Sequence, residues 1–364
     1  MSGVPCTVQT ESRTAAVLNP ERRPDGGRRY GGAVENRPSL DPSVAEVRLA
    51  VRRALAPLEA PATVVVGLSG GADSLALAAA TAFEAPRLGL RALAVTVDHG
   101  LQPGSADAAA AAARTATGLG LDAVVVQARV GTDGGPEAAA RAARYTALRA
   151  SARTAGATAI LVGHTLDDQA ETVLLGLARG SGAASLQGMA AASDLDGIAL
   201  LRPLLDVRRE ITRAACRAEG LEPWDDPHNV EPRFARVRVR ERVMPMLEAE
   251  LGPGIAEALA RTAEQLREDA AAFAEMIDEI IEDIVEHAEA GISVSVPALA
   301  ANPAALRNRV IRHVVASEFH QSLTRSQTLE VARLVTDWRG QGPIDLPGCR
   351  AHRAGDRLVF TASA

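Results

Sequence analysis

Apolar stretches of two kinds alternate along residues 60–222. Short runs rich in β-branched residues predict buried strands at 63–68, 91–98, 122–130, 158–163 and 198–205. Longer segments with an apolar face predict helices at 74–84, 105–118, 136–155, 167–179 and 207–219. Because helices fill the gaps between successive strands, this pattern predicts βαβ units and an α/β fold with a doubly wound parallel sheet.

The pattern changes near Pro223, where helical periodicity takes over. Helices are predicted at 241–251, 254–289, 303–319 and 325–339, with short strands at 343–346 and 357–361. The start of the chain has no apolar periodicity and is expected to be disordered. The expected organisation is a disordered extension over 1–45, an α/β domain over 46–230, a basic junction and long helical connector over 231–290, and a mainly helical C-terminal domain over 291–364.

Net charge, cysteine content and the length of apolar runs argue against several classes of function. The net charge of -6 argues against a chain that coats nucleic acid indiscriminately, although a local basic groove remains compatible with it. Cys6, Cys216 and Cys349 are isolated, so the sequence predicts neither a disulfide framework nor a metal cluster, which fits a reducing cytoplasm. No apolar run approaches the roughly 20 residues of a membrane span, so no membrane partner is expected.

A glycine-rich turn lies between the first predicted strand and the first predicted helix, in the run Ser69-Gly70-Gly71-Ala72-Asp73-Ser74. Backbone N–H groups at such a helix N-terminus bind phosphate, and a divalent cation beside the phosphate would explain Asp73. A Walker A loop is excluded because the chain has no lysine. The structural alternative is a strand–turn–helix with Ser69 as N-cap.

Further polar residues follow other predicted strands. Asp98, His99 and His164 fall at strand ends, where parallel sheets bind ligands. After His164, the carboxylates of Asp167 and Asp168 suit Mg²⁺ on polyphosphate oxygens. Alternatively, Thr165 and Asp168 form a capping box, and the two interpretations are compatible.

Two groups of arginines suggest contacts to phosphate. Arg141, Arg144 and Tyr145 share one helix face, which forms either a bidentate clamp or an ordinary solvated surface. The most basic decade of the chain is either a solvated face or a contact to a phosphate backbone. It contains Arg233, Arg236, Arg238, Arg240 and Arg242.

The glycine-rich run resembles the SGGxDS loop of the N-type ATP pyrophosphatases (PP-loop superfamily). Other segments are similar to the tRNA(Ile)-lysidine synthetase family within it, although Val237 stands where that family has asparagine. These segments are VDHGL at 97–101, ExxARxxRY at 137–145, GHxxDDQxET at 163–172, LxRGSG at 177–182, RPLL…REI at 202–211 and D-P-x-N at 226–229. The resemblance implies a Rossmann-like catalytic domain, a tRNA-binding C-terminal domain, and a short form lacking the last domain of longer members.

The resemblance also implies a reaction. ATP adenylates the C2 oxygen of the wobble cytidine in a CAU-anticodon isoleucine tRNA, and free L-lysine then displaces AMP to leave lysidine. Members are often dimeric, which leaves a homodimer open. Position in the motifs also implies roles for single residues. ATP is expected to be bound by Ser69, Gly70, Gly71, Ala72, Asp73, Ser74, Asp98, His99, Gly163, Arg179 and Gly180, and Mg²⁺ by Asp73 and Asp168. The expected catalytic residues are Asp73, Arg141, His164, Asp167 and Asp168, and the expected tRNA contacts are Arg144, Tyr145, Arg202, Arg209, Arg233, Arg236, Arg238 and Arg240.

Two other functions remain open at this stage. A tRNA 2-thiolation enzyme of the same superfamily would use a cysteine pair or an iron–sulfur cluster, whereas this chain has no CxxC motif. An RNA-binding protein with a relic nucleotide site would not need the intact loop with Asp73, nor His164.

Overall fold

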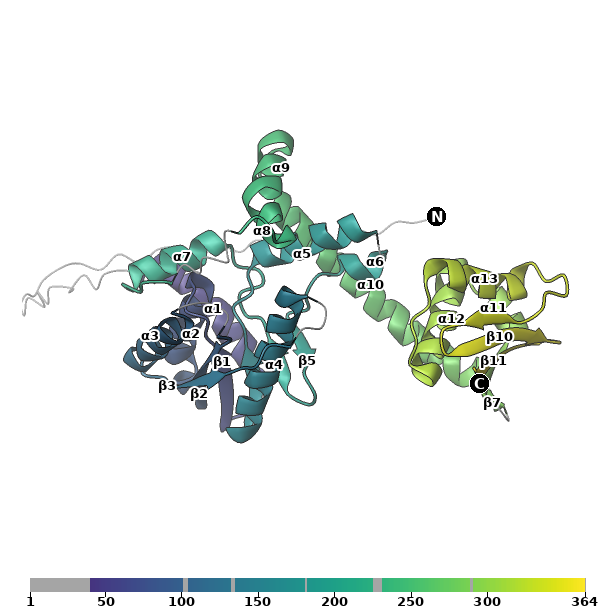
Figure 1. Ribbon diagram of the computed structural model, residues 1–364, viewed down its shortest axis with the longest axis horizontal. Helices are drawn as coiled ribbons and strands as arrows, with labels where there is room; N and C mark the ends of the chain where they lie inside the picture. The colour runs from purple at the N-terminus through teal and green to yellow at the C-terminus, as the bar shows by residue number, and fades with distance from the viewer. Residues whose placement is uncertain are drawn as a thin grey trace, which may run out of the picture. The chain divides into compact units, whose positions relative to one another are not determined.

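The computed structural model describes residues 40–100, 104–131, 135–180, 182–224, 231–288 and 291–363. The first part is built on a six-stranded sheet with strand order β3-β2-β1-β4-β6-β5 (Figure 1). All neighbours in this sheet are parallel except the β5–β6 pair. The strands are β1 (Ala62–Gly67), β2 (Leu90–Asp98), β3 (Asp122–Gln127), β4 (Ala157–Leu161), β5 (Ala192–Asp194) and β6 (Ala199–Leu201). The predicted α/β fold is therefore confirmed.

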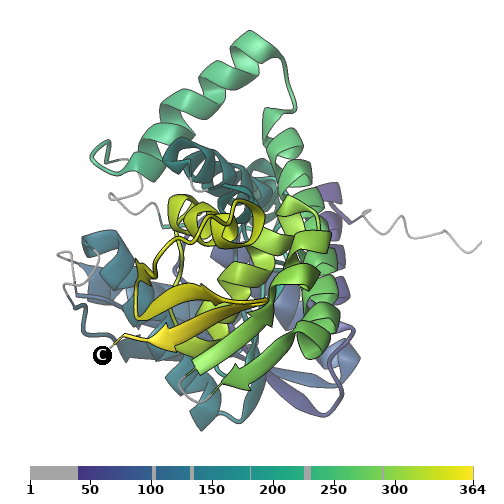
Figure 2. The same ribbon diagram turned by 90° about the vertical axis from the view of Figure 1, so that its right-hand side faces the viewer.

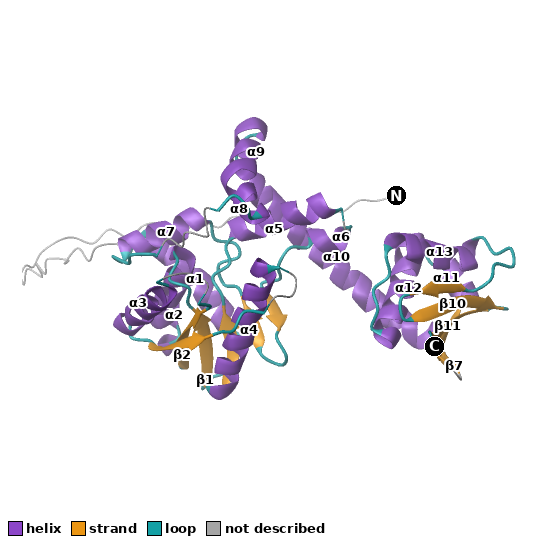
Figure 3. Ribbon diagram, viewed as in Figure 1, coloured by secondary structure: helices purple, strands orange, loops and turns teal. Residues whose placement is uncertain are grey.

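Helices cover both faces of this sheet, as Figure 3 shows with helices in purple and strands in orange. Because side chains alternate along a strand, Val64 and Val66 of β1 enter one core cluster and Val65 enters another. The first cluster includes residues of α1 (Pro42–Leu55), α2 (Ala72–Glu84), α3 (Ser105–Gly118) and α7 (Arg209–Ala218), and the second includes residues of α4 (Pro136–Thr154).

The remaining helices of this part follow β4 and β6. They are α5 (Leu166–Arg179), α6 (Ala183–Leu186), α8 (Ala235–Arg238), a π-helix at Val239–Val243 and α9 (Met244–Leu251). The long α10 (Ile255–Ile284) packs against α5 through Ala256, which lies in a small cluster with Leu166 and Ala170. No helix in the described ranges is long and apolar enough to cross a membrane.

The C-terminal part combines helices with a five-stranded antiparallel sheet of order β7-β8-β11-β10-β9, coloured green to yellow in Figure 2. The strands are β7 (Val285–Ala288), β8 (Gly291–Ser295), β9 (Ile344–Leu346), β10 (Cys349–Ala354) and β11 (Arg357–Ala362), and the helices are α11 (Val296–Ala301), α12 (Ala304–Phe319) and α13 (Arg325–Thr336). One core joins the sheet to the helices, with Phe360 and Leu334 fully buried. The sequence predicted the two long helices and strands β9 and β11, but not the other three strands.

The expected disorder over 1–45 is wrong at its end. Asp41 caps α1 by accepting a hydrogen bond from the Ser43 amide at 2.9 Å, and Pro42 occupies the first helical position. Val44, Val47, Val51 and Leu55 follow at helical spacing and are buried. The rest of the extension (1–39), Leu101, Ser181 and the 226–229 turn lie outside the described residues.

Candidate active site

The loop after β1 leaves the N-terminus of α2 open. The N-cap is Gly71, with no side-chain cap, so the interpretation of Ser69 as N-cap is wrong. Instead the Ser74 hydroxyl accepts from the Ser69 amide at 3.1 Å and donates to the Gly71 carbonyl at 2.9 Å. Gly70 has φ +86, which favours glycine. The first amides of α2 are therefore oriented to bind an anion rather than consumed by a cap.

Asp73, in the first turn of α2, is a partly buried carboxylate whose charge is only partly compensated. Its Oδ1 accepts a hydrogen bond from the Thr212 hydroxyl, and its Oδ2 lies 3.5 Å from Arg209 Nε. Burial raises the pKa of Asp73, in spite of the opposing effects of Thr212 and Arg209. A cation beside Asp73 would supply the missing compensation.

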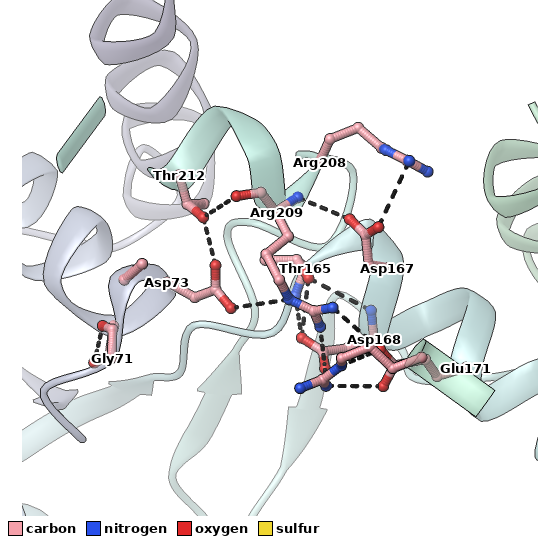
Figure 4. A network of polar contacts seen from close by, with 12 residues as sticks. Gly71, Asp73, Thr165, Asp167, Asp168, Glu171, Arg208, Arg209 and Thr212 are labelled. Carbon is pink, nitrogen blue, oxygen red and sulfur yellow. Dashed lines mark hydrogen bonds and ion pairs between the residues drawn. The ribbon is translucent and has the colours of Figure 1, made fainter. Parts of the chain in front are cut away.

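Arg209 lies between Asp73 and two carboxylates of α5, as Figure 4 shows. Its guanidinium lies 2.9 Å from Asp168 Oδ1 and 3.1 Å from Glu171 Oε1. Burial alone would lower the pKa of Arg209, but Asp168, Glu171 and Asp73 raise it. The arginine is therefore held as a cation at the centre of the site, connecting the first turns of α2, α5 and α7.

Asp168 is fully engaged by protein groups. The predicted capping box is confirmed, with Oδ2 accepting from the Thr165 amide at 3.0 Å while Oδ1 faces Arg209 and Arg240. Burial would raise the pKa of Asp168, but Arg209 and Arg236 outweigh it and lower the pKa to about 2. Neither oxygen is left for a metal ion, so the geometry does not fit Asp168 as a magnesium ligand.

Asp73 does fit such a ligand, because Oδ2 has only the longer contact to Arg209. Mg²⁺ is commonly bound by one or two carboxylates together with substrate phosphates. No group of three or more His, Cys, Asp or Glu side chains placed to hold a metal occurs in the described part of the chain. A magnesium ion here would depend on the nucleotide for much of its coordination.

Glu171 is the buried centre of an arginine cluster and was absent from the residues expected at the site. Its carboxylate, with a side chain 2% exposed, pairs with Arg209, Arg236 and Arg240. The Arg240 Nε–Oε1 distance is 2.7 Å, and the Arg236 Nε–Oε2 distance is 3.0 Å. Arg240 belongs to the π-helix, a form that often occurs at functional sites. Thr212 was missed as well.

His164 follows β4 and has an unpaired nitrogen inside the site. Its Nδ1 is buried without a hydrogen-bond partner among the described residues. Burial, with Arg141 and Arg202 nearby, lowers the pKa of His164 to about 4 against the opposing effect of Asp168. At neutral pH the imidazole is therefore uncharged and has a hydrogen-bonding position to offer a ligand.

The depressed pKa of His164 predicts a pH dependence of stability. The pKa falls from its usual 6.5 to about 4 on folding, so the unfolded chain takes up the proton first and stability is lost as pH falls from 6.5 towards 4. Between pH 7 and 4.5 the wild type should lose about 2 to 3 kcal/mol more than His164→Asn. Urea denaturation of both chains across this range measures the difference. Equal losses would contradict it.

Gly163 brings the end of β4 against the first turn of α2. A Cβ atom at this position would lie 2.9 Å from the carbonyl oxygen of Asp73. Gly163→Ala should therefore displace Asp73, reduce ATP-dependent pyrophosphate release by about tenfold or more, and cost about 1 to 3 kcal/mol of stability. Gly118→Ala is the control, since nothing lies within 4 Å of its added Cβ. Equal activities in the two variants would contradict this close-packing argument.

Other expected site residues divide into two groups. Asp98 ends β2 with Oδ1 accepting from the Gly100 amide at 3.0 Å, and burial lowers the pKa of His99 beside Arg144. Arg141 donates to the Tyr145 hydroxyl at 3.4 Å and acts electrostatically on His164, so the predicted helix face borders the site. Arg179 and Gly180, however, lie at the far end of α5, about 20 Å along the helix from Leu166, and are not gathered with the loop.

Four arginines expected to contact tRNA are directed inwards. Arg202 donates to the Ala190 carbonyl at 2.6 Å, while the partners of Arg209, Arg236 and Arg240 are the α5 carboxylates. These four arginines therefore have partners within the protein, three of them carboxylates, and contact of their side chains with tRNA stays a prediction. Arg233 and Arg238 remain exposed.

Two family profiles match this chain. The profile described as a PP-loop domain matches residues 45–247, and that of the TilS substrate binding domain matches residues 294–359. A tRNA(Ile)-lysidine synthase from Leifsonia xyli subsp. xyli is 60% identical over 306 residues, which are 84% of this chain and 91% of that protein. The chain belongs to the tRNA(Ile)-lysidine synthase family.

Further members of the lysidine synthase family match over similar lengths. The protein of that name from Thermobifida fusca is 50% identical over 88% of this chain and 98% of its own. Among solved structures, a U34-tRNA thiolase, NcsA from Methanococcus maripaludis, has a TM-score of 0.54 and 21% identity, covering 62% of this chain and 80% of that one. The similarity to this thiolase supports the fold alone.

Proposed function

We propose that this chain joins L-lysine to C2 of the wobble cytidine in the CAU-anticodon isoleucine tRNA, converting ATP to AMP and pyrophosphate. The observation that carries the proposal is the 60% identity to a tRNA(Ile)-lysidine synthase over 84% of the chain. The open N-terminus of α2 beside Asp73 supplies the site that such chemistry requires. A thiolation enzyme or a relic RNA binder has no comparable support.

The first step forms an adenylate. The C2 oxygen of the cytidine attacks the α-phosphorus of ATP, and the bond to the β-phosphate oxygen breaks to release pyrophosphate. Amides at the N-terminus of α2 bind the departing pyrophosphate, because unpaired N–H groups and the helix dipole stabilise the negative charge. A magnesium ion held by Asp73 would neutralise phosphate charge here, and Arg209 keeps that carboxylate in place.

The second step replaces the adenylate by lysine. The ε-amine attacks C2, AMP leaves with the former C2 oxygen, and the amine gives up a proton. The uncharged His164 is a hydrogen-bonding group for this step, since its free nitrogen lies in the site. Arg141, exposed at the border of the site, is proposed to contact the activated base.

Several finer assignments belong to the proposal. The partners are the tRNA, free L-lysine and Mg²⁺-ATP, and the reaction takes place in the cytoplasm. Residues 291–364 form the tRNA-binding domain, which the match of 294–359 to a substrate binding domain supports. A second copy of the chain is a further proposed partner. Asp73 is retained as magnesium ligand, whereas Asp168 is reassigned to positioning Arg209.

The test measures pyrophosphate release from Mg²⁺-ATP with the unmodified tRNA, in the presence and absence of lysine. Release that requires this tRNA, together with labelled lysine entering the RNA, is the expected result. ATP cleavage without incorporation of lysine would indicate another nucleophile and favour thiolation. No cleavage with any tRNA would overturn the proposed function.

A further inference from the structure

A groove of about 380 Å³ lies between α12 and α13 of the C-terminal domain. Arg307 and Asn308 line it from α12, and Leu329 and Arg333 line it from α13. Its walls also include hydroxyl side chains and a single acidic residue, Glu330. The groove thus places two guanidinium groups from different helices around one opening.

Two polar atoms of the groove residues lack partners among the described residues, although Arg307 also donates from Nη1 to the Asn302 carbonyl at 3.1 Å. Arg307 Nε and Asn308 Oδ1 are buried without a hydrogen bond to any described residue. Because an unsatisfied buried polar group carries a desolvation cost, such atoms point to a ligand or water that completes them. Ala304, the first residue of α12, also lines the groove, and its N-cap Pro303 provides no side-chain cap. The positive end of a 16-residue helix therefore contributes to the same opening.

The charge around the groove is one-sided. Segment 294–359 contains nine arginines and five acidic residues, although the whole chain has a net charge of -6. The described ion pairs of this domain use Arg339, Arg350 and Arg357, none of which lines the groove. The groove itself has one carboxylate, Glu330, beside Arg307 and Arg333, and neither arginine takes part in an ion pair among the described residues.

The long helix α10, in contrast, is rich in acidic residues. Its sequence has two arginines, Arg261 and Arg267, against nine acidic residues. A polyanion is repelled by such a surface and attracted to the groove, because the local distribution of charge governs its approach. Electrostatics thus favours the α12–α13 face over its connector.

We propose that the α12–α13 groove binds phosphate groups of the tRNA backbone, with Arg307 and Arg333 as the principal contacts. The inference rests on the proposed function and adds a specific surface to it. Asn308, with its unpaired carbonyl oxygen, would accept a hydrogen bond from a ribose hydroxyl or a base amino group. Leu329, 41% exposed, provides an apolar surface beside these polar contacts.

The experiment measures the affinity of the full chain for the unmodified tRNA transcript over a range of salt concentrations. Arg307→Gln/Arg333→Gln should raise Kd about tenfold and make the slope of log K against log salt less negative by about 1.5, since each lost phosphate contact accounts for about 0.7 to 0.9. At saturating tRNA, kcat should be unchanged and KM for tRNA should rise with Kd. Arg333→Gln alone should give about half of the change in slope.

Arg350→Gln is the matched control, because Arg350 is an exposed arginine of the same domain that pairs with Asp345 at 2.7 Å outside the groove. It should leave both Kd and the slope unchanged. If the double variant unfolds, Arg333→Gln alone still tests the inference. The exposed Arg333 side chain has no described partner, so its replacement should leave the fold intact.

Unchanged Kd and slope in folded Arg333→Gln would overturn the inference. A rise in KM for ATP in place of tRNA would also overturn it, by assigning the groove to free nucleotide phosphates. A wild-type chain that binds tRNA without incorporating lysine would overturn the proposed function, and the binding data would still decide on the groove.

Discussion

Asp73→Asn is expected to reduce pyrophosphate release about a thousandfold, equivalent to roughly 4 kcal/mol of transition-state stabilisation. The amide cannot supply the negative charge that a cation on the nucleotide requires. It also breaks the contact with Arg209, whose Nε lies 3.5 Å from Oδ2. Single-turnover release of labelled pyrophosphate measures the chemical step, and tRNA affinity should stay within about twofold because no phosphate-binding arginine is removed.

The matched control for this variant is Asp107→Asn, an exposed aspartate in the first turn of α3. It carries the same change of charge, likewise in the first turn of a helix, and should retain full activity. Loss of tRNA affinity in Asp73→Asn would contradict the assignment, because it would show that the residue supports the RNA site and not the nucleotide site.

Glu171→Gln should cost about 3 to 5 kcal/mol of folding stability, because it leaves three guanidinium groups around a buried neutral amide. For a domain of this size the loss corresponds to a fall of about 10 °C in the melting temperature. Activity should fall as well, since Arg209 would lose one of the carboxylates that hold it against Asp73. Thermal denaturation and pyrophosphate release are measured on the same preparations.

Glu268→Gln, at an exposed position of α10, removes the same charge without breaking a described ion pair. Its melting temperature should remain within about 1 °C of the wild type. A Glu171→Gln protein as stable as this control would show that the arginines find other compensation, and the cluster would then not be the element that joins α5, α7 and the π-helix.

Sequence reasoning predicted the central sheet because its strands are continuous β-branched runs, and the carboxyl ends of those strands brought Asp73, Asp98 and His164 to one edge. The sequence did not reveal which arginines pair with which carboxylates in the folded chain. Arg236 and Arg240 meet Glu171 across 65 and 69 positions of the chain. No local periodicity identifies a carboxylate that far away, so the sequence alone suggests contacts to RNA for arginines that pair with Glu171 in the fold.

The other features that the sequence did not predict have different causes. The sequence predicts β7 as part of the preceding helix, since Val285–Ala288 is short and follows Ile284 directly, with no glycine or proline to mark the end of the helix. Helix α1 carried a readable signal in the Asp41-Pro42 cap, but it lay beside a segment of disordered composition. Glu171 belongs to the GHxxDDQxET segment, but only the packing of α5 against α7 and the π-helix shows that it is the centre of a charge cluster.

The backbone of Trp224 is bonded to the phosphate loop, its amide donating to the Gly70 carbonyl at 2.9 Å. The chain has only two tryptophans, and the other, Trp338, lies in the C-terminal domain beneath Arg353. Each indole thus belongs to one of the two matched domains. The protein consequently carries one intrinsic fluorophore in each matched domain, and Trp338→Phe would leave only the emission of Trp224, whose backbone is bonded to the loop after β1.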